Sequence, residues 1–162
     1  MNEPSGWVEF VKWLGQAAVV GIGWAVVHHL SAQRDLDKAR REMTAKSADG
    51  LADALSSILT EARDYHLNGR DQKLELALKM ALQDVAMRVQ ALSDICPEKA
   101  ALARCRAAVA ALRRATTGRH FEDDHVGPLP ETAQQLEEIA DAVLRAKRDL
   151  LGLKHLQFSP AA

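Results

Sequence analysis

The chain has 162 residues, a net charge of −1 at pH 7 and a hydrophobic content of 48%, which leaves room for one domain beside a short extra segment. Of its 21 basic and 22 acidic residues only Lys12, Glu3 and Glu9 precede residue 31, so the rest of the chain is electrically balanced. This balance argues against bulk nucleic-acid binding, which usually needs a strongly basic surface. Aromatic residues make up only 4%, so the core must be aliphatic, which suits helix-on-helix packing.

Residues 13–30, WLGQAAVVGIGWAVVHHL, form the one long segment without a charged side chain. As a helix they would extend roughly 27 Å, close to the about 30 Å of a bilayer's hydrocarbon core. The three tryptophans Trp7, Trp13 and Trp24 fall at or near the ends of this run, as is typical of the membrane–water interface. We therefore predict a transmembrane helix over 13–30 after a short tail of residues 1–12.

Three alternatives stay open for this segment: a buried helix of a soluble domain, a re-entrant or interfacial helix, and a cleaved signal peptide. Glycines 15, 21 and 23 would weaken a helix in water but are common in membrane spans. A signal peptide would need a basic start and a small-residue cleavage site, whereas His28, His29 and Leu30 stand where that site would be.

The charges that flank the span predict its orientation. One lysine precedes it, and five basic residues follow it closely: Arg34, Lys38, Arg40, Arg41 and Lys46. Because cytoplasmic flanks carry an excess of lysine and arginine, the long C-terminal part is expected in the cytoplasm and the N-terminus outside. This layout is typical of a single-pass protein of the bacterial inner (plasma) membrane.

Small residues in the predicted span indicate association with a second copy. Ala17, Gly21 and Ala25 share one helix face, and such a row lets two spans approach closely. Residues 31–48 are expected to form a charged helical stalk, whose narrow seam of Leu36, Ala39 and Met43 suits a short coiled coil. We therefore expect a homo-oligomer.

Residues 49–158 are predicted to be all-α and to form an antiparallel bundle of about four helices, with 159–162 as a tail. A break or a weak point of the helix is expected at Asp49-Gly50. The first helix is expected to end at Asn68-Gly69, and the others are expected over 72–95, over about 98–116 and over about 131–156. Each helix has an apolar seam that repeats at helical spacing. The seam residues are Leu51, Leu55, Ile58, Ala62, Tyr65, Leu78, Leu82, Val85, Val89, Leu92, Leu102, Cys105, Val109, Leu112, Leu136, Ile139, Val143, Ala146, Leu150 and Leu153.

Local signals place the ends of these helices. They are the Asn68-Gly69 turn, the Asp71 N-cap, a turn at 94–97 with Pro97 (or a kinked continuous helix) and a C-cap at Gly118. Leu76, Met80 and Met87 widen the apolar face of the helix at 72–95, which predicts packing against two neighbours. Cys96 and Cys105 are expected to be thiols, because helical spacing holds them too far apart for a disulfide.

The loop 119–130 holds the best candidates for metal ligands, namely His120, Glu122, Asp123, Asp124 and His125. Two imidazoles and three carboxylates could bind Zn²⁺ or Mn²⁺. Their spacing matches no established motif, and the alternative is a solvated acidic loop near helix ends.

Arg106 and Arg113 lie seven residues apart, hence on one helix face, with Arg104, Arg114 and Arg119 nearby. Such a stripe could bind a phosphate or a nucleotide. The alternative is ion pairing with the acidic side chains of the following helix, which are Glu131, Glu137, Glu138 and Asp141.

The sequence holds no order of residues typical of nucleophilic catalysis, no glycine-rich phosphate loop and no HExxH, and we expect no cofactor. The leading interpretation is a membrane-anchored, non-enzymatic interaction, scaffold or signalling module. Its expected partners are the lipid bilayer, a second copy and an unidentified protein. The alternatives are a membrane-perturbing effector whose bundle senses a signal, and a metal-dependent enzyme at the 119–130 loop.

Overall fold

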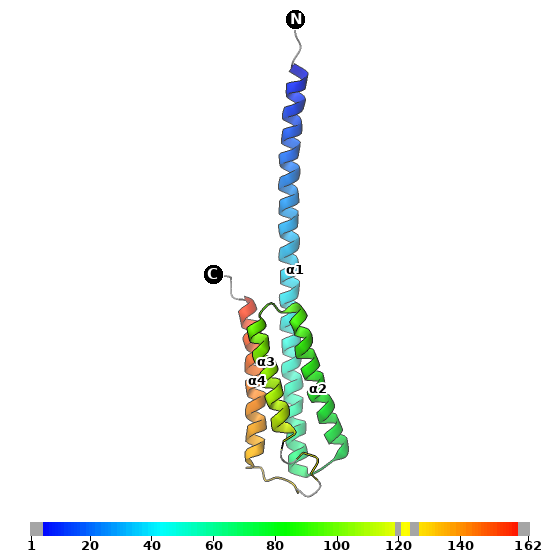
Figure 1. Ribbon diagram of the computed structural model, residues 1–162, viewed down its shortest axis with the longest axis vertical. Coiled ribbons are helices and arrows are strands. Elements are labelled where there is room, and N and C mark those ends of the chain that lie inside the picture. The colour runs from blue at the N-terminus through cyan, green and yellow to red at the C-terminus, as the bar shows by residue number, and fades with distance from the viewer. Residues whose placement is uncertain (1–4, 119–120, 124–126, 159–162) are drawn as a thin grey trace. The chain divides into compact units, whose positions relative to one another are not determined.

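The computed structural model describes residues 5–118, 121–123 and 127–158, which form four α-helices and no strand (Figure 1). The helices are α1 (Ser5–Asn68), α2 (Gln72–Ile95), α3 (Lys99–Thr116) and α4 (Gln134–Phe158). The predicted all-α class is therefore confirmed for this part of the chain. The chain divides into two compact units, which we call the N-terminal unit (Met1–Ala39) and the core unit (Arg40–Ala162).

The N-terminal unit contains the apolar part of α1. Among the described residues α1 is the one helix long and apolar enough to cross a membrane, with a mean hydropathy of 1.5 over its most apolar window. No part of that window is buried, and Trp7, Trp13 and Trp24 are all exposed. The rings of Trp24 and His28 stack one turn apart, with 5.2 Å between their centroids.

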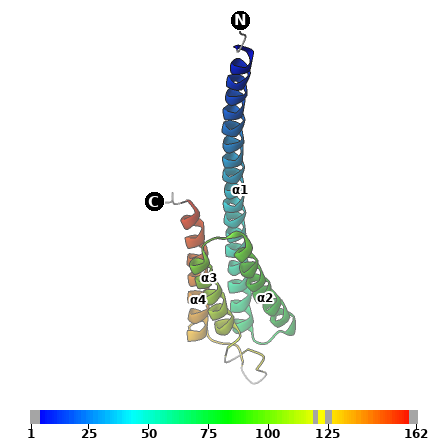
Figure 2. The same ribbon diagram turned by 45° about the horizontal axis from the view of Figure 1, so that its top comes forward.

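In the core unit all four helices contribute to one hydrophobic core, and their segments lie side by side (Figure 1, Figure 2). The side chains that are almost fully buried are Leu51, Leu55, Ile58, Leu78, Val85, Val89, Leu102, Leu112, Ile139, Val143, Leu150 and Leu153. These residues belong to the predicted apolar seams, so the helical period in the sequence identified the core correctly. Leu136 is the exception, because it is only half-buried.

Polar contacts give the relative direction of α1 and α4. Lys154 Nζ lies 2.9 Å from both carboxylate oxygens of Asp49, and Lys147 Nζ donates to the hydroxyl of Ser56. Because residue numbers rise along α4 as they fall along α1, the two helices run in opposite directions. Helix α3 packs closely against α4 and also against α2.

Three of the predicted helix ends are confirmed, namely the end of α1 and both ends of α2. Gly69, with a φ of +85°, follows the end of α1, and the Asp71 carboxylate then accepts from the backbone N–H of Lys73 (2.8 Å) and Leu74 (3.4 Å). Helix α2 stops at Ile95, so Pro97 lies in a turn and not in a kinked helix. Helix α4 begins at Gln134, three residues later than 131.

The expected break at Asp49-Gly50 is wrong, because α1 continues through both residues. Glycine inside a helix costs about 1 kcal/mol relative to alanine. Here Ala48 and Leu51 on either side are buried in the core, and their burial offsets that cost.

The C-cap role predicted for Gly118 is also wrong. Thr117 caps α3, with an N–H···O bond to Arg113, and Gly118 does not adopt a positive φ. A Cβ at position 118 would lie 2.9 Å from the carbonyl oxygen of Arg114. The absence of a side chain, and not the left-handed backbone, is therefore what this position requires.

The outer apolar residues of α2 do not reach a second neighbour. Leu76, Met80 and Met87 are all more than half exposed, so the prediction that α2 packs on two helices through them is wrong. The seam of α2 from Leu78 to Leu92 already fills its side of the core. The stalk residues Leu36 and Met43 are exposed as well.

Candidate functional site at the polar end of the core unit

Polar side chains gather at one end of the core unit, where α1 and α3 end and α2 and α4 begin. Tyr65, His66, Glu75 and Thr116 are buried there, in contrast to the aliphatic interior between the helices. We call this group the polar end, and it consists of Tyr65, His66, Glu75, Lys79, Thr116, Phe121, Glu122 and Gln135.

His66 is the central residue of the polar end, with only 4% of its surface exposed. Its Nε2 lies 3.3 Å from the carbonyl oxygen of Thr116 and 3.4 Å from Nε2 of Gln135. Its own carbonyl oxygen accepts from the N–H of Leu129 at 2.8 Å. One residue thus connects α1 with the end of α3, the start of α4 and the loop between them.

Two buried polar atoms beside His66 have no hydrogen-bond partner within the described part of the chain. They are Oγ1 of Thr116, whose residue is fully buried, and Oε1 of Gln135. Buried polar atoms are usually satisfied, by protein or by ordered water. These two atoms therefore leave the hydrogen bonding of the polar end incomplete within the described part of the chain.

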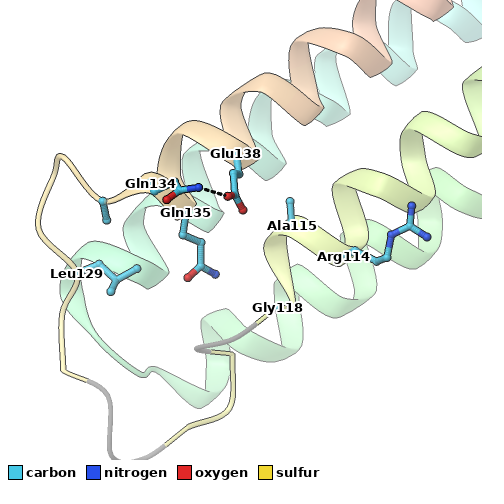
Figure 3. Close-up of a pocket in the computed structure, with 8 residues that line it drawn as sticks. Arg114, Ala115, Gly118, Leu129, Gln134, Gln135 and Glu138 are labelled. Carbon is cyan, nitrogen blue, oxygen red and sulfur yellow. Dashed lines mark hydrogen bonds between the residues drawn. The ribbon is translucent and has the colours of Figure 1, made fainter.

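A hollow of about 320 Å³ opens between the end of α3 and the start of α4 (Figure 3). Gln135 and Arg114 both line it, Thr116 does not, and the side chain of Arg114 points away from Gln135. Glu138 contributes a carboxylate that accepts from Nε2 of Gln134 at 2.9 Å. The remaining lining residues are Ala115, Gly118, Leu129 and Ala133. The hollow thus presents the Glu138 carboxylate as a hydrogen-bond acceptor beside a partly apolar wall.

The described part of the loop 119–130 is held on the helix ends by Phe121 and Glu122. The carboxylate of Glu122 pairs with Lys79, and its backbone N–H donates to Oη of Tyr65 at 3.1 Å. The rings of Phe121 and Tyr65 have centroids 5.0 Å apart. Glu122 adopts a left-handed φ of +67°, so its contacts hold a conformation that non-glycine residues rarely adopt.

Charge pairing shifts the pKa of two side chains at this end. The hydrogen bond from Lys79 (2.9 Å) lowers the pKa of Glu75; burial opposes this, and the nearby Arg70 adds to it. The pKa of Lys79 is raised by its bonds to Glu122 and Glu75. Both shifts favour the charged forms, so this network is an ion-pair cluster and not an acid–base pair poised near neutral pH.

The structure describes two of the five candidate metal ligands, Glu122 and Asp123. The Glu122 carboxylate is paired with Lys79, and the described residues contain no group of three or more histidine, cysteine or acidic side chains suited to a metal ion. His120, Asp124 and His125 lie outside the described residues.

Arg106 and Arg113 are exposed on α3. Ion pairing with the acidic residues of the following helix was the expected alternative; none of the ion pairs of the described residues joins Arg106 or Arg113 to Glu131, Glu137, Glu138 or Asp141. In the predicted association row, Gly21 has open space around its Cα, while the side chains of Ala17 and Ala25 lie outside the described residues.

The sequence contains one indication that His66 is buried, but it does not show which residues His66 contacts. Position 66 lies four residues after the buried Ala62, hence near the buried face of α1. The contacts of His66 with Thr116 and Gln135 depend on tertiary packing.

The two cysteines are both buried, and burial raises the pKa of the Cys105 thiol to about 11, which makes it unreactive at neutral pH.

Comparisons with protein-family models, with curated proteins and with solved structures find no match for this chain.

Proposed function

We propose that the protein is a non-enzymatic interaction module, anchored in a membrane by residues 13–30 and carrying an antiparallel helical bundle as its binding part. The observation that carries this proposal is that no described side chain in the apolar window of α1 is buried. A helix of a soluble domain buries its apolar face against neighbours, whereas a lipid-facing span needs none. The exposed tryptophans near its ends fit the two membrane interfaces.

The contacts of the polar end favour binding over catalysis. Its carboxylates and amines are held as ion pairs, with Lys79 between Glu75 and Glu122. Groups fixed in their charged forms by such pairing are poorly suited to transfer protons near neutral pH. The hollow beside Gln135 offers the Glu138 carboxylate to a small ligand or to a partner's side chain, which suits a module that senses or scaffolds.

We propose further that the protein lies in the inner (plasma) membrane with its N-terminus outside and the core unit in the cytoplasm. Support comes from the five basic residues that follow the span, against Lys12 before it. Alkaline phosphatase and a fluorescent protein, fused to the C-terminus in separate versions, test this orientation. We expect an inactive phosphatase and a bright fluorophore; an active phosphatase with a dark fluorophore would overturn it.

An assay of membrane integrity separates a quiet module from a membrane-perturbing effector. Cells that express the full chain are exposed to a dye that intact membranes exclude. We expect uptake equal to that of cells carrying the empty vector, because the proposed role needs only an anchor. Uptake that rises with induction would replace the module with an effector.

A further inference from the structure

Three arginines from two helices surround one hollow on the surface of the core unit. Arg104 comes from α3, and Arg145 and Arg148 come from α4. We call this hollow the arginine groove; its volume is about 390 Å³, and its other lining residues are Ala107, Ala108, Ala111, Ala142 and Asp149. Arg106 and Arg113, the two arginines predicted as a possible anion site, do not line it, whereas Arg104, which the sequence analysis named beside them, does.

The alanines explain why a hollow exists here. Helix α3 packs closely against α4, and short side chains at Ala108, Ala111 and Ala142 permit this approach. The same short side chains leave the surface between the helices unfilled. Arginine side chains on either side are long and can cover apolar surface with their methylene stems while their guanidinium groups stay at the rim.

The charge of the arginine groove is not neutralised by the rest of the described chain. Arg104, Arg145 and Arg148 are exposed and form none of the ion pairs of the described residues. Within the described part of the chain, Arg145 donates only to the backbone oxygen of Asp141, at 3.4 Å. Asp149 is the one acidic residue among the described lining residues. Three positive groups against one negative group create a local field that attracts anions.

We propose that the arginine groove binds the phosphate group of a small organic phosphate, supplied either as a soluble molecule or as a lipid headgroup. A phosphate monoester carries almost two negative charges and three acceptor oxygens, and guanidinium groups match it with paired N–H donors. The groove is larger than a phosphate group alone, so the alanine floor can accept the rest of the molecule. This inference goes beyond the proposed anchoring function and does not depend on it.

Two probes distinguish the two sources of phosphate. The full chain is placed in nanodiscs of neutral phosphatidylcholine and titrated with inorganic pyrophosphate by calorimetry. In a second arm phosphatidic acid, whose headgroup is a phosphate monoester, replaces part of the lipid, no soluble phosphate is added, and the arginine Nε signals are followed by NMR. A response to pyrophosphate supports a soluble ligand, and a response only to phosphatidic acid supports a headgroup. No response in either arm overturns the proposal.

Matched variants test the residues. Each of Arg104→Gln, Arg145→Gln and Arg148→Gln is expected to weaken binding about tenfold, since each removes a charge-assisted contact. The triple variant should abolish it. The control triple, Arg106→Gln with Arg113→Gln and Arg114→Gln, removes the same charge outside the groove and should change the affinity by about twofold at most. Equal losses in both triples would show an unspecific charge effect and overturn the site.

A second pair of variants guards against loss of folding in the triple variant. Ala107→Glu places a carboxylate in the exposed floor of the groove, and Ala110→Glu places one on α3 outside it. Neither position is in the hydrophobic core. Binding should be lost only with Ala107→Glu. Full binding by Ala107→Glu would place the phosphate elsewhere and overturn the proposal.

Discussion

Val89 and Met87 lie two residues apart on α2 and meet opposite environments, with 1% and 56% of their surfaces exposed. Val89→Asp would place a charge without a partner in the core, at a cost of about 3 kcal/mol or more. Met87→Asp changes a solvent-facing position and should alter stability by about 0.5 kcal/mol or less. A circular-dichroism melt of the full chain in mild detergent should lose its cooperative transition only for Val89→Asp. Equal effects at both positions would contradict the observed facing of α2.

The ionisation of Glu75 is expected to make the free energy of unfolding depend on pH. Its pKa is lowered in the folded state by Lys79 and Arg70, so its contribution is fully present above its unfolded pKa of about 4.3. That contribution is lost as the pH falls through the lower folded pKa. The pKa of Lys79 is raised, so its own contribution is lost only in strongly alkaline solution.

Denaturant unfolding of the full chain and of Glu75→Gln, between pH 7 and pH 2.5, measures this contribution. We expect Glu75→Gln to be less stable by about 1–2 kcal/mol at pH 7, because it leaves Lys79 without one of its carboxylates. The gap should close as the pH falls below about 4.3. The control Asp53→Asn removes an exposed carboxylate without an ion pair in the described chain. A gap for Glu75→Gln that does not change with pH would disprove the assigned role.

At the scale of elements, the start of α2 depends on one side chain. The Asp71 carboxylate accepts from two backbone N–H groups of the first turn, at 2.8 and 3.4 Å. Asp71→Ala should destabilise the core unit by about 1 kcal/mol, whereas Asp71→Asn keeps an equivalent acceptor and should cost much less. The midpoint of urea unfolding measures both. An Ala variant as stable as the Asn variant would show that the cap contributes nothing.

The apolar part of α1 predicts association with a second copy. We expect Gly21→Leu to reduce pairing of the span, because a larger side chain would separate two backbones that approach along the row of Ala17, Gly21 and Ala25. Gly23→Leu lies off this row and serves as the control. A membrane-helix dimerisation reporter compares both with the natural span. Identical signals from all three would remove this row as an interface, and a loss only at position 23 would move the contact to another face.

The ends of the helices could be predicted where a local signal decides them. Asp71 and Pro97 act through their own backbone and side-chain chemistry, and the predicted bounds of α2 match the observed ones. The helical conformation at Gly50 could not be predicted from a local signal. Its local preference for a break is outweighed by the burial of Ala48 and Leu51, which depends on helices far along the chain.

The candidate sites were harder to predict, because both consist of residues from different helices that come together only in the folded chain. Arg104 is separated by about forty residues from Arg145 and Arg148, and only the close packing of α3 on α4 gathers them around one groove. The same holds for His66, Thr116 and Gln135. A helical period shows which face of a helix is apolar, but it does not show which polar residues of different helices meet.

At the scale of the whole molecule, the two units differ in whether their apolar side chains are buried or exposed. The core unit buries its leucine, isoleucine and valine seams from four helices in one core. The N-terminal unit leaves its apolar side chains exposed, including Trp13, Val20 and Ile22. A large bare apolar surface is unfavourable in water and needs lipid or protein to cover it. This contrast is the physical basis of the proposal that one unit anchors the protein and the other binds a partner.

The most direct test of membrane anchoring is an alkaline carbonate wash of membranes from cells that express the full chain, compared with cells that express residues 40–162. Carbonate releases proteins held by surface contacts and leaves integral spans in the membrane pellet. We predict that the full chain stays in the pellet and that residues 40–162 are recovered in the supernatant as a folded, helical protein. Recovery of the full chain in the supernatant would contradict the membrane anchor.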